Sequence, residues 1–279
     1  MYPYLHIHIF SFEKDITTYG VVALVGFLFF IIPALIYTIK AKKDFYDRFV
    51  FLAFLLAIGA ACAFVLYTLT NIGYWIKVIP IILKDVSKWK EYMNFGIVYY
   101  GGFIGIIIAM MVYSKMFNED VRTWAWQTIV SIPGFHAIGR VGCALSGCCY
   151  GKIVDEGGIY NAVIDKYCLP IQLYEAIGEF IIFLIILAYI LIKKNSKAYY
   201  IPLGIYCSLY SILRFVDEFW RGDRIRGVWG PFSTSQYISM LILPFGIYCL
   251  VCPTEKNFLN KWYMGRKEQK KNNTEAISD

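Results

Sequence analysis

Long apolar blocks are the feature of this sequence that most restricts its fold. Several blocks run for roughly 20 residues, the length that an α-helix needs to cross about 30 Å of hydrocarbon. Hydrophobic residues make up 58% of the 279 residues and charged residues 17%. A soluble domain is closer to about half apolar and about a quarter charged. We therefore expect an all-α, polytopic membrane protein.

We expect about seven membrane-spanning helices, each of roughly 20 residues. Their expected ranges are 17–39, 49–70, 96–116, 124–147, 170–192, 199–219 and 233–252. Together they would form one transmembrane domain over residues 17–252. Residues 1–16 contain no basic region and no small-residue cleavage site, so we expect an interfacial segment and no removable signal peptide. The polar, basic tail at 253–279 is expected to be solvated and partly disordered.

Residues 71–95 carry too many charges to span a bilayer. They hold an apolar stretch with lysines and tryptophans around it, which is typical of an arm that lies on the membrane surface. A plain connecting loop is the alternative, and the composition leaves both open. We include an external interfacial arm in the expected fold.

The distribution of Lys and Arg predicts the orientation. Cytoplasmic segments of bacterial membrane proteins are enriched in these residues. With the amino terminus outside, the cytoplasmic side would hold the basic tail and Lys40, Lys42, Lys43, Arg48, Lys115, Arg122, Lys193, Lys194 and Lys197. The other side would hold fewer. We therefore expect the amino terminus outside and the carboxyl terminus in the cytoplasm, and the net charge of +7 then requires no nucleic-acid partner.

Two arginines, Arg140 and Arg214, lie within expected spans. A charge at the centre of a spanning helix costs about 2.5–3.5 kcal/mol on insertion scales, so such a residue marks a candidate functional site. Carboxylates accompany Arg214, and Glu218, four residues later, shares its helix face and can orient it. Two buried cations with nearby carboxylates suggest a site for an anionic headgroup.

The cysteines fall into two groups. Cys62, Cys207, Cys249 and Cys252 lie in or beside apolar spans, where a free thiol packs as a small hydrophobic group. Cys143, Cys148 and Cys149, with Cys168 as a fourth candidate, lie on the outer side. We favour structural thiols there, with a disulfide or direct chemistry as alternatives. The spacing is not a usual zinc pattern and would require His136 as a ligand, so we expect no metal and no cofactor.

His136 is the one histidine within the expected spans. It precedes Arg140 by four residues, so both side chains lie on one face of a regular helix. A buried histidine often only packs as a satisfied polar group. The shared face with a buried arginine makes a functional role an equal alternative.

Several motifs, in order along nearly the whole chain, resemble those of the prolipoprotein diacylglyceryl transferase family. The motifs are Thr18-Tyr19-Gly20, Tyr100-Gly101-Gly102-Phe103-Ile104-Gly105, the glycine-rich signature from Gly139 to Lys152, Pro170-Ile171-Gln172-Leu173-Tyr174-Glu175, the segment from Tyr210 to Arg221, and Ser235-Gln236. Each motif alone is weak. Their common order and spacing make the resemblance specific.

The resemblance implies a bacterial plasma-membrane enzyme that moves the diacylglyceryl group of phosphatidylglycerol to the thiol of a prolipoprotein lipobox cysteine and releases glycerol phosphate. By the same resemblance, Arg140 and Arg214 would bind the phosphate. The supporting and substrate-binding positions would be Tyr19, Gly101, Gly102, Cys143, Gly151, Tyr210, Glu218 and Arg221. Preorganised guanidinium groups suit this reaction because negative charge grows on the leaving phosphate.

The sequence departs from the family pattern at positions that bear on proton transfer. Tyr100 stands where the family has histidine, while Cys143, Ser146 and Cys148 replace two asparagines and a glutamate, and Ile171 replaces Ser or Thr. Tyrosine, with an ordinary pKa of about 10, is a poor base near neutral pH. We hypothesise that His136 supplies the base and that Tyr100 positions donor or thiol. The alternative is that the arginines activate the thiol and His136 only packs.

Two other functions stay open from the sequence. One is a related enzyme that uses the same phospholipid donor with a different acceptor. The other is a transporter or redox protein in which Arg140 and Arg214 line a pathway. The two transferase hypotheses predict one cavity open to lipid. The transporter or redox hypothesis predicts alternating access, a quinone or a haem.

Overall fold

The computed structural model describes residues 4–9, 12–40, 44–88, 98–122, 124, 128–193, 198–223, 227–254 and 256–263. The chain divides into two compact units. The first comprises Met1–Lys42 and Arg122–Asn260, and the second comprises Lys43–Val121 and Lys261–Asp279. The long insertion of the second unit separates the first helix of the first unit from the rest of that unit.

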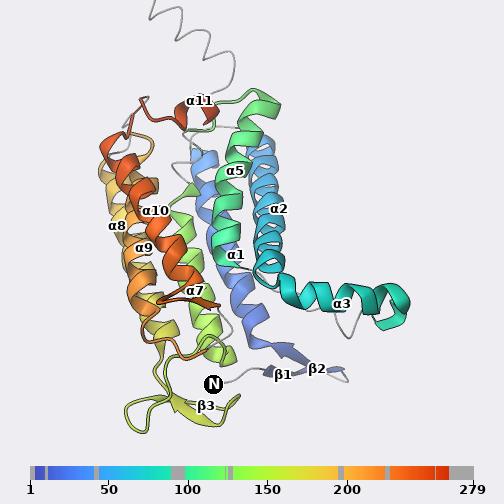
Figure 1. The fold of residues 1–279 in the computed structure, drawn as a ribbon. Helices are drawn as coiled ribbons and strands as arrows, with labels where there is room; N and C mark the ends of the chain where they lie inside the picture. Colours follow the sequence, from blue (N-terminus) through green and yellow to red (C-terminus); the bar gives the residue numbers. More distant parts are fainter. Residues whose placement is uncertain are drawn as a thin grey trace, which may run out of the picture. The chain divides into compact units, whose positions relative to one another are not determined.

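The first unit is built mainly from helices that pack in series. These are α1 (Thr18–Lys40), α7 (Ser131–Ser146), α8 (Ile171–Ile192), α9 (Ile201–Asp217) and α10 (Thr234–Val251). Helix α1 packs on α7, α7 on α8, α8 on α9, and α9 on α10. Figure 1 shows α8, α9 and α10 running side by side. Because α7, α8 and α9 are neighbours, their inward faces can share one polar site.

In the described part of this unit there are three short antiparallel hairpins. They are β1 (Tyr4–Ile9) with β2 (Phe12–Thr17), β3 (Ile159–Asn161) with β4 (Lys166–Cys168), and β5 (Val228–Trp229) with β6 (Phe232–Ser233). The mostly helical fold is therefore confirmed, but the all-α expectation misses these strands. The segment at 1–16, expected as an interfacial stretch, contains the first hairpin.

The second unit pairs α2 (Phe45–Thr70) with α5 (Tyr99–Phe117). Small residues permit this close packing. A Cβ atom at Gly105 would lie 2.6 Å from the Cβ atom of Cys62, and one at Gly101 would lie 2.6 Å from the carbonyl oxygen of Cys62. Such contacts are typical of helices that pack without a hydrophobic driving force between them.

The expected external arm contains a helix. Helix α3 (Ile72–Lys84) follows α2 after Asn71 and is succeeded by the short 3-10 helix η1 (Val86–Lys88). Figure 1 shows α3 turning away from the end of α2. Trp75 and Val78 are buried, whereas Ile76, Ile79 and Leu83 are exposed. The described part of this segment is therefore not a plain loop, and its contact with a membrane surface stays a prediction.

Four described helices are long and apolar enough to cross a membrane: α2, α5, α8 and α10. Helices α7 and α9 occupy expected spans but have only 16 and 17 residues. Helix α1 has 23 residues, of which Thr18–Ile32 form a shorter apolar stretch. Within the expected span 124–147, α7 covers Ser131–Ser146 after a turn at residues 129 and 130, and residues 125–127 lie outside the described part of the chain. The count of about seven spans stays a prediction.

Helix α8 has polar side chains on its buried face and apolar side chains on its exposed face, the reverse of a surface helix in a soluble protein. Its inward face holds Gln172, Glu175 and Glu179, which are at most 2% exposed. Its outward face holds large apolar side chains such as Ile177 and Phe180, about half exposed. Apolar side chains on the outside are stable only in an apolar solvent. This arrangement supports a bilayer environment and reserves the interior for polar chemistry.

The end of the chain is described as far as residue 263. It forms the short helix α11 (Asn260–Tyr263), whose last carbonyl accepts a hydrogen bond of 3.1 Å from the backbone N–H of Val121. The expectation of a solvated tail at 253–279 falls mostly on residues outside the described part of the chain.

Candidate active site

Helix α7 carries the first three polar side chains of the site. His136, Arg140 and Cys143 lie on its buried face, at spacings of four and three residues, and are 8%, 6% and 9% exposed. A Cβ atom at Gly142 would lie 3.2 Å from the ring of Tyr19, so this glycine lets α7 approach α1 closely. The helix ends at Gly147, whose φ of 74° is in the left-handed region that glycine adopts readily.

Glu175 of α8 joins two arginines from different helices. Its Oε2 atom lies 2.7 Å from Arg140 Nη2 and 3.5 Å from Arg214 Nη1. All three residues are at most 6% exposed. A buried charge without a partner would be strongly destabilising, so the shared carboxylate makes it feasible to hold both cations in the interior.

Arg214 of α9 has further partners. Its Nη2 atom lies 2.8 Å from an oxygen of Glu218 and donates a hydrogen bond of 3.2 Å to Ser235 Oγ at the start of α10. The expected pairing of Arg214 with Glu218 is therefore present in the structure. Together these contacts fix the guanidinium plane between α8, α9 and α10.

The two guanidinium groups retain donors for a ligand. Arg140 Nε is buried and donates no hydrogen bond among the described residues, and the buried Arg214 Nη1 lies 3.5 Å from Glu175 Oε2 without a hydrogen bond to it. Buried N–H groups of this kind are normally satisfied, so each unused donor requires an explanation. Guanidinium groups bind phosphate and carboxylate oxygens with charge-assisted hydrogen bonds. The pair therefore fits an anionic group that enters beside Glu175.

His136 lies between carboxylates. Its Nδ1 atom is 2.5 Å from Glu179 Oε1, and its Nε2 atom is 3.9 Å from Glu175 Oε1. The short contact places one hydrogen between Nδ1 and the Glu179 oxygen, which fixes the orientation of the ring. The edge of Tyr210 adds a T-shaped ring contact with a centroid separation of 5.3 Å. Nε2 is thus the ring nitrogen on the side of Glu175, the carboxylate that both arginines contact.

The loop after α7 is tied to the end of α9. Gly151 and Arg221 form an isolated antiparallel bridge, and the N–H of Gly222 donates to the carbonyl of Tyr150 at 3.0 Å. A Cβ atom at Gly151 would lie 2.5 Å from the carbonyl oxygen of Leu169, so only glycine fits there. Arg221 forms a two-bond pair with Asp223, at 3.0 and 2.7 Å. These contacts hold the loop over the end of the helices.

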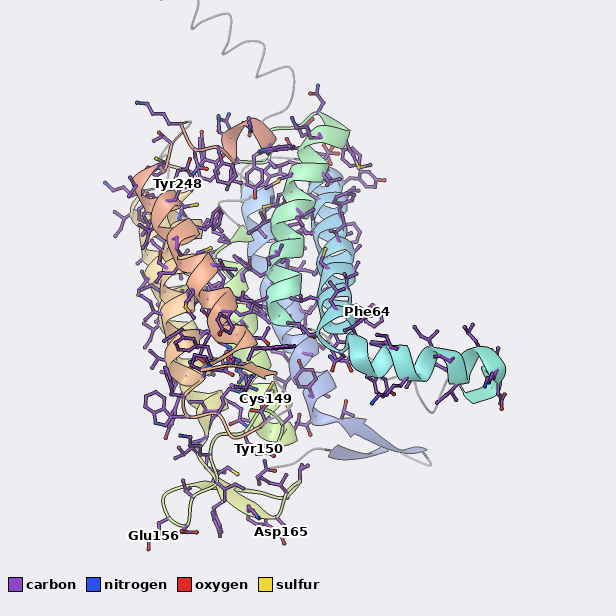
Figure 2. The ribbon with its side chains drawn as sticks, in the orientation of Figure 1. Phe64, Cys149, Tyr150, Glu156, Asp165 and Tyr248 are labelled. Atoms are coloured by element: carbon purple, nitrogen blue, oxygen red, sulfur yellow. The ribbon has the colours of Figure 1, made fainter. Side chains whose placement is uncertain are left out.

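Three thiols meet at the end of α7. The sulfur atoms of Cys143, Cys148 and Cys149 all lie within 4.8 Å of one another, and all are free thiols. Arg140 Nη1 donates to Cys143 Sγ at 3.6 Å. Figure 2 labels Cys149 and Tyr150 near the end of the helices, with Glu156 and Asp165 farther out in the loop. Cys168, the fourth candidate from the sequence, is not part of this group.

Several of the predicted site residues come together in the first unit. Arg140, Arg214, His136, Tyr210 and Glu218 form one connected cluster, Cys143 contacts Arg140, and Gly151 pairs with Arg221. Tyr19 lies on α1, 38% exposed, beside Gly142. The other three, Tyr100, Gly101 and Gly102, lie on α5 of the second unit, where Tyr100 is 3% exposed and both glycines face α2.

Sequence reasoning missed Glu175 and Glu179 as site residues. Glu175 was quoted only as the end of a motif, and Glu179 was not singled out. Both are carboxylates inside an apolar stretch of 22 residues, a signal as strong as that of the arginines. Helix periodicity is a second signal, because polar residues that recur every three to four positions lie on one face of a helix, as Gln172, Glu175 and Glu179 do.

The sequence is similar to proteins of a known family over most of its length. The family model described as prolipoprotein diacylglyceryl transferase matches residues 7–252. A phosphatidylglycerol–prolipoprotein diacylglyceryl transferase of Clostridium tetani is 33% identical over 61% of this chain and 66% of its own length. A protein of the same name from Clostridioides difficile is 28% identical over 88% and 94%, and one from Helicobacter pylori is 27% identical over 74% and 75%. The chain therefore belongs to the prolipoprotein diacylglyceryl transferase family.

Proposed function

We propose that this protein transfers the diacylglyceryl group of phosphatidylglycerol to the thiol of the lipobox cysteine of prolipoproteins. The observation that carries the proposal is the pair of buried arginines, Arg140 and Arg214, which share Glu175 and keep unused N–H donors. Membership in the transferase family supplies the donor and the acceptor named for the relatives.

In this proposal the arginine pair binds the phosphate of the donor. The acceptor sulfur attacks the glycerol carbon that carries the phosphate ester, a carbon–sulfur bond forms, and the carbon–oxygen bond breaks. The electron pair stays on the phosphate oxygen, so the leaving glycerol phosphate gains negative charge. Fixed guanidinium groups away from water stabilise that charge without having to reorganise. Glu175 keeps the two cations at a constant separation while the charge moves.

The acceptor thiol must lose a proton, because the thiolate is the nucleophile. We assign the base to His136, whose Nε2 atom lies on the side of Glu175, the partner of both arginines, while Nδ1 is held by Glu179. Tyr100 stands at the position of the family's histidine and is assigned to positioning the donor or the thiol. Tyr19, Gly101, Gly102, Gly151, Tyr210 and Arg221 are assigned to shaping the substrate site.

We further propose a bacterial plasma-membrane topology of about seven spans. The amino terminus would be outside and the carboxyl terminus in the cytoplasm, as the distribution of Lys and Arg favours. The thiol end of α7 would then face the outer leaflet, and α3 would lie along the outer interface. This places the reaction where a translocated lipobox arrives.

The test is a transfer assay with purified full-length protein. The protein is reconstituted in vesicles with phosphatidylglycerol, and a lipobox peptide is added and analysed by mass spectrometry. We expect the peptide to gain one diacylglyceryl group, and a peptide with Ser in place of the lipobox Cys to gain none. Release of glycerol phosphate without a modified peptide would indicate a different acceptor. Neither product, in vesicles where an active family member works, would contradict the proposal.

A further inference from the structure

The three-thiol cluster is not used by the mechanism above. Cys143 lies in the last turn of α7, and Cys148 and Cys149 follow the left-handed turn at Gly147. Cys149 itself has a φ of 56°, an uncommon backbone conformation for a residue with a side chain. The residue in this conformation contributes the third sulfur of the group. Strained backbone of this kind often occurs at functional sites.

The sulfur geometry suits a thiophilic metal ion. Zinc binds thiolates at about 2.3 Å, so tetrahedral ligands lie about 3.8 Å apart. The three sulfurs are within 4.8 Å of one another, so side-chain movements of at most about 1 Å would close the site. Zinc sites that carry out chemistry keep three protein ligands and one open position. The trio supplies that number of ligands.

The surroundings favour an open anionic complex. A zinc ion with three thiolates carries one net negative charge, and Arg140 Nη1 already donates to Cys143 Sγ at 3.6 Å. Cys143 is buried, whereas Cys148 is exposed and Cys149 half-buried. The cluster is therefore held by protein on one side and accessible on the other. An external ligand can reach the fourth position from the side of Cys148.

We propose that Cys143, Cys148 and Cys149 bind a zinc ion and that the fourth position takes the acceptor thiol of the transfer reaction. The second half rests on the proposed function. A thiol that coordinates zinc loses its proton outright, which gives a nucleophile at neutral pH. The proton passes to the base, the role assigned to His136. This arrangement compensates for the tyrosine at position 100, which is a poor base.

The step is balanced without an oxidant or a reductant. The zinc-bound thiolate attacks the glycerol carbon of the donor, and the carbon–sulfur bond forms as the carbon–oxygen bond to phosphate breaks. The electron pair remains on the phosphate, which Arg140 binds beside the cluster. The product is a neutral thioether, a much weaker zinc ligand than a thiolate, so it leaves and the fourth position is free again.

Metal binding is tested first, on reduced full-length protein in detergent. Cadmium serves as the probe, because cadmium–thiolate bonds absorb in the ultraviolet, and zinc content is measured by elemental analysis. We expect one metal per chain and loss of the absorption band in Cys148→Ser and in Cys149→Gly. The latter removes a thiol at a backbone position that glycine adopts readily, so the fold is retained. Cys252→Ser, which alters a half-buried thiol outside the trio, is the matched control and should keep the band.

Two results would overturn the metal site. One is a band of equal strength in the wild type, Cys148→Ser and Cys149→Gly. The other is a disulfide between two of the three cysteines in protein isolated under conditions that trap the native thiols, since the oxidised pair cannot supply two thiolates.

The role of the fourth position has a readout that does not require turnover. A lipobox peptide added to the cadmium-loaded protein should increase the band by one thiolate, and the peptide with Ser in place of Cys should not. Equal spectra with both peptides would contradict the proposal that the acceptor thiol occupies the fourth position. Full transfer by metal-stripped protein would also contradict the role of zinc in binding the acceptor thiol, but it would leave the proposed transferase function intact. Metal binding without any peptide lipidation by the zinc-loaded protein would contradict the proposed function and leave the zinc site intact.

Discussion

Glu175 has a role at the residue scale that neither arginine can take over. One of its oxygens contacts two guanidinium groups that come from α7 and α9. Without that negative charge, two like charges would face each other in a buried site. The residue is therefore both a structural counter-ion and the spacer that fixes the distance across which a phosphate must fit.

Replacing Glu175 by Gln tests this double role. The amide keeps the size of the side chain but removes the charge, so we expect destabilisation of about 3–5 kcal/mol. We expect transfer to fall by about 10²-fold, because small displacements of catalytic groups are costly. Thermal unfolding in detergent and the peptide assay measure the two effects. Glu156→Gln, at an exposed loop position, is the control and should change neither. Full activity of the Glu175→Gln variant would show that Glu175 does not contribute to the active site.

The arginines test the phosphate assignment directly. Arg140→Ala and Arg214→Ala should each reduce transfer by about 10²–10³-fold while the protein still inserts into the membrane. Arg→Lys should recover little, because a point charge cannot donate two parallel hydrogen bonds to phosphate. The exposed Lys166→Ala is the matched change of a cation outside the site. Near-normal transfer by both alanine variants would contradict the phosphate role.

His136→Gln tests the base. Glutamine retains size and hydrogen bonding but cannot accept and release a proton, so transfer should fall by about 10²–10⁴-fold. Glu179→Gln, which leaves the imidazole but changes its partner, should have a smaller effect. An unchanged rate and pH profile in His136→Gln would mean that the histidine only packs.

At the scale of elements, small residues determine how closely helices approach. A Cβ atom at Gly105 would lie 2.6 Å from Cys62 Cβ and 3.0 Å from Gly59 Cα, so α2 and α5 would have to separate. We expect Gly105→Ala to destabilise the protein by about 1–3 kcal/mol in thermal unfolding. At Gly73 of α3 a Cβ atom meets nothing within 4 Å, so Gly73→Ala should be neutral or stabilising by up to about 1 kcal/mol. Equal effects of both variants would show that the close packing is not important.

The sequence predicted some elements well and others poorly, for identifiable reasons. The apolar block at 170–192 corresponds to α8, Ile171–Ile192, because its length and hydrophobicity leave no alternative to a helix. The turn at residues 129 and 130, just before α7, was not expected, because the apolar residues continue through it. The strands β3 to β6 have only two or three residues, too few for an alternating pattern, whereas the alternation in Tyr4–Ile9 was overlooked. The arginine site could be located from the sequence because a charge within a membrane span is costly and therefore marks a candidate functional site. The meeting of Glu175 with both arginines depends on how helices pair, which no single segment encodes.

At the scale of the whole molecule, the topology is the main prediction left to test. In intact cells, a membrane-impermeant thiol reagent should label the Ser87→Cys variant, whose new thiol lies in η1 of the arm, more strongly than the parent protein. Lys193→Cys, at the exposed end of α8, should be labelled only after permeabilisation. A carboxyl-terminal tag should likewise be protected in intact cells. The reverse pattern would place the thiol end of α7 on the cytoplasmic side.

The inverted polarity of α8 has a consequence for how this protein meets its donor. Isoleucine and phenylalanine side chains cover the outside of this helix, while Glu175 and Glu179 lie on its inner side. The acyl chains that solvate the helix are chemically the same as those of the donor lipid. Substrate thus arrives by lateral diffusion within a two-dimensional fluid and never has to enter water. The quantity that governs encounter is then the mole fraction of anionic lipid in the leaflet, and dilution with neutral lipid slows the reaction even when the total amount of donor is constant.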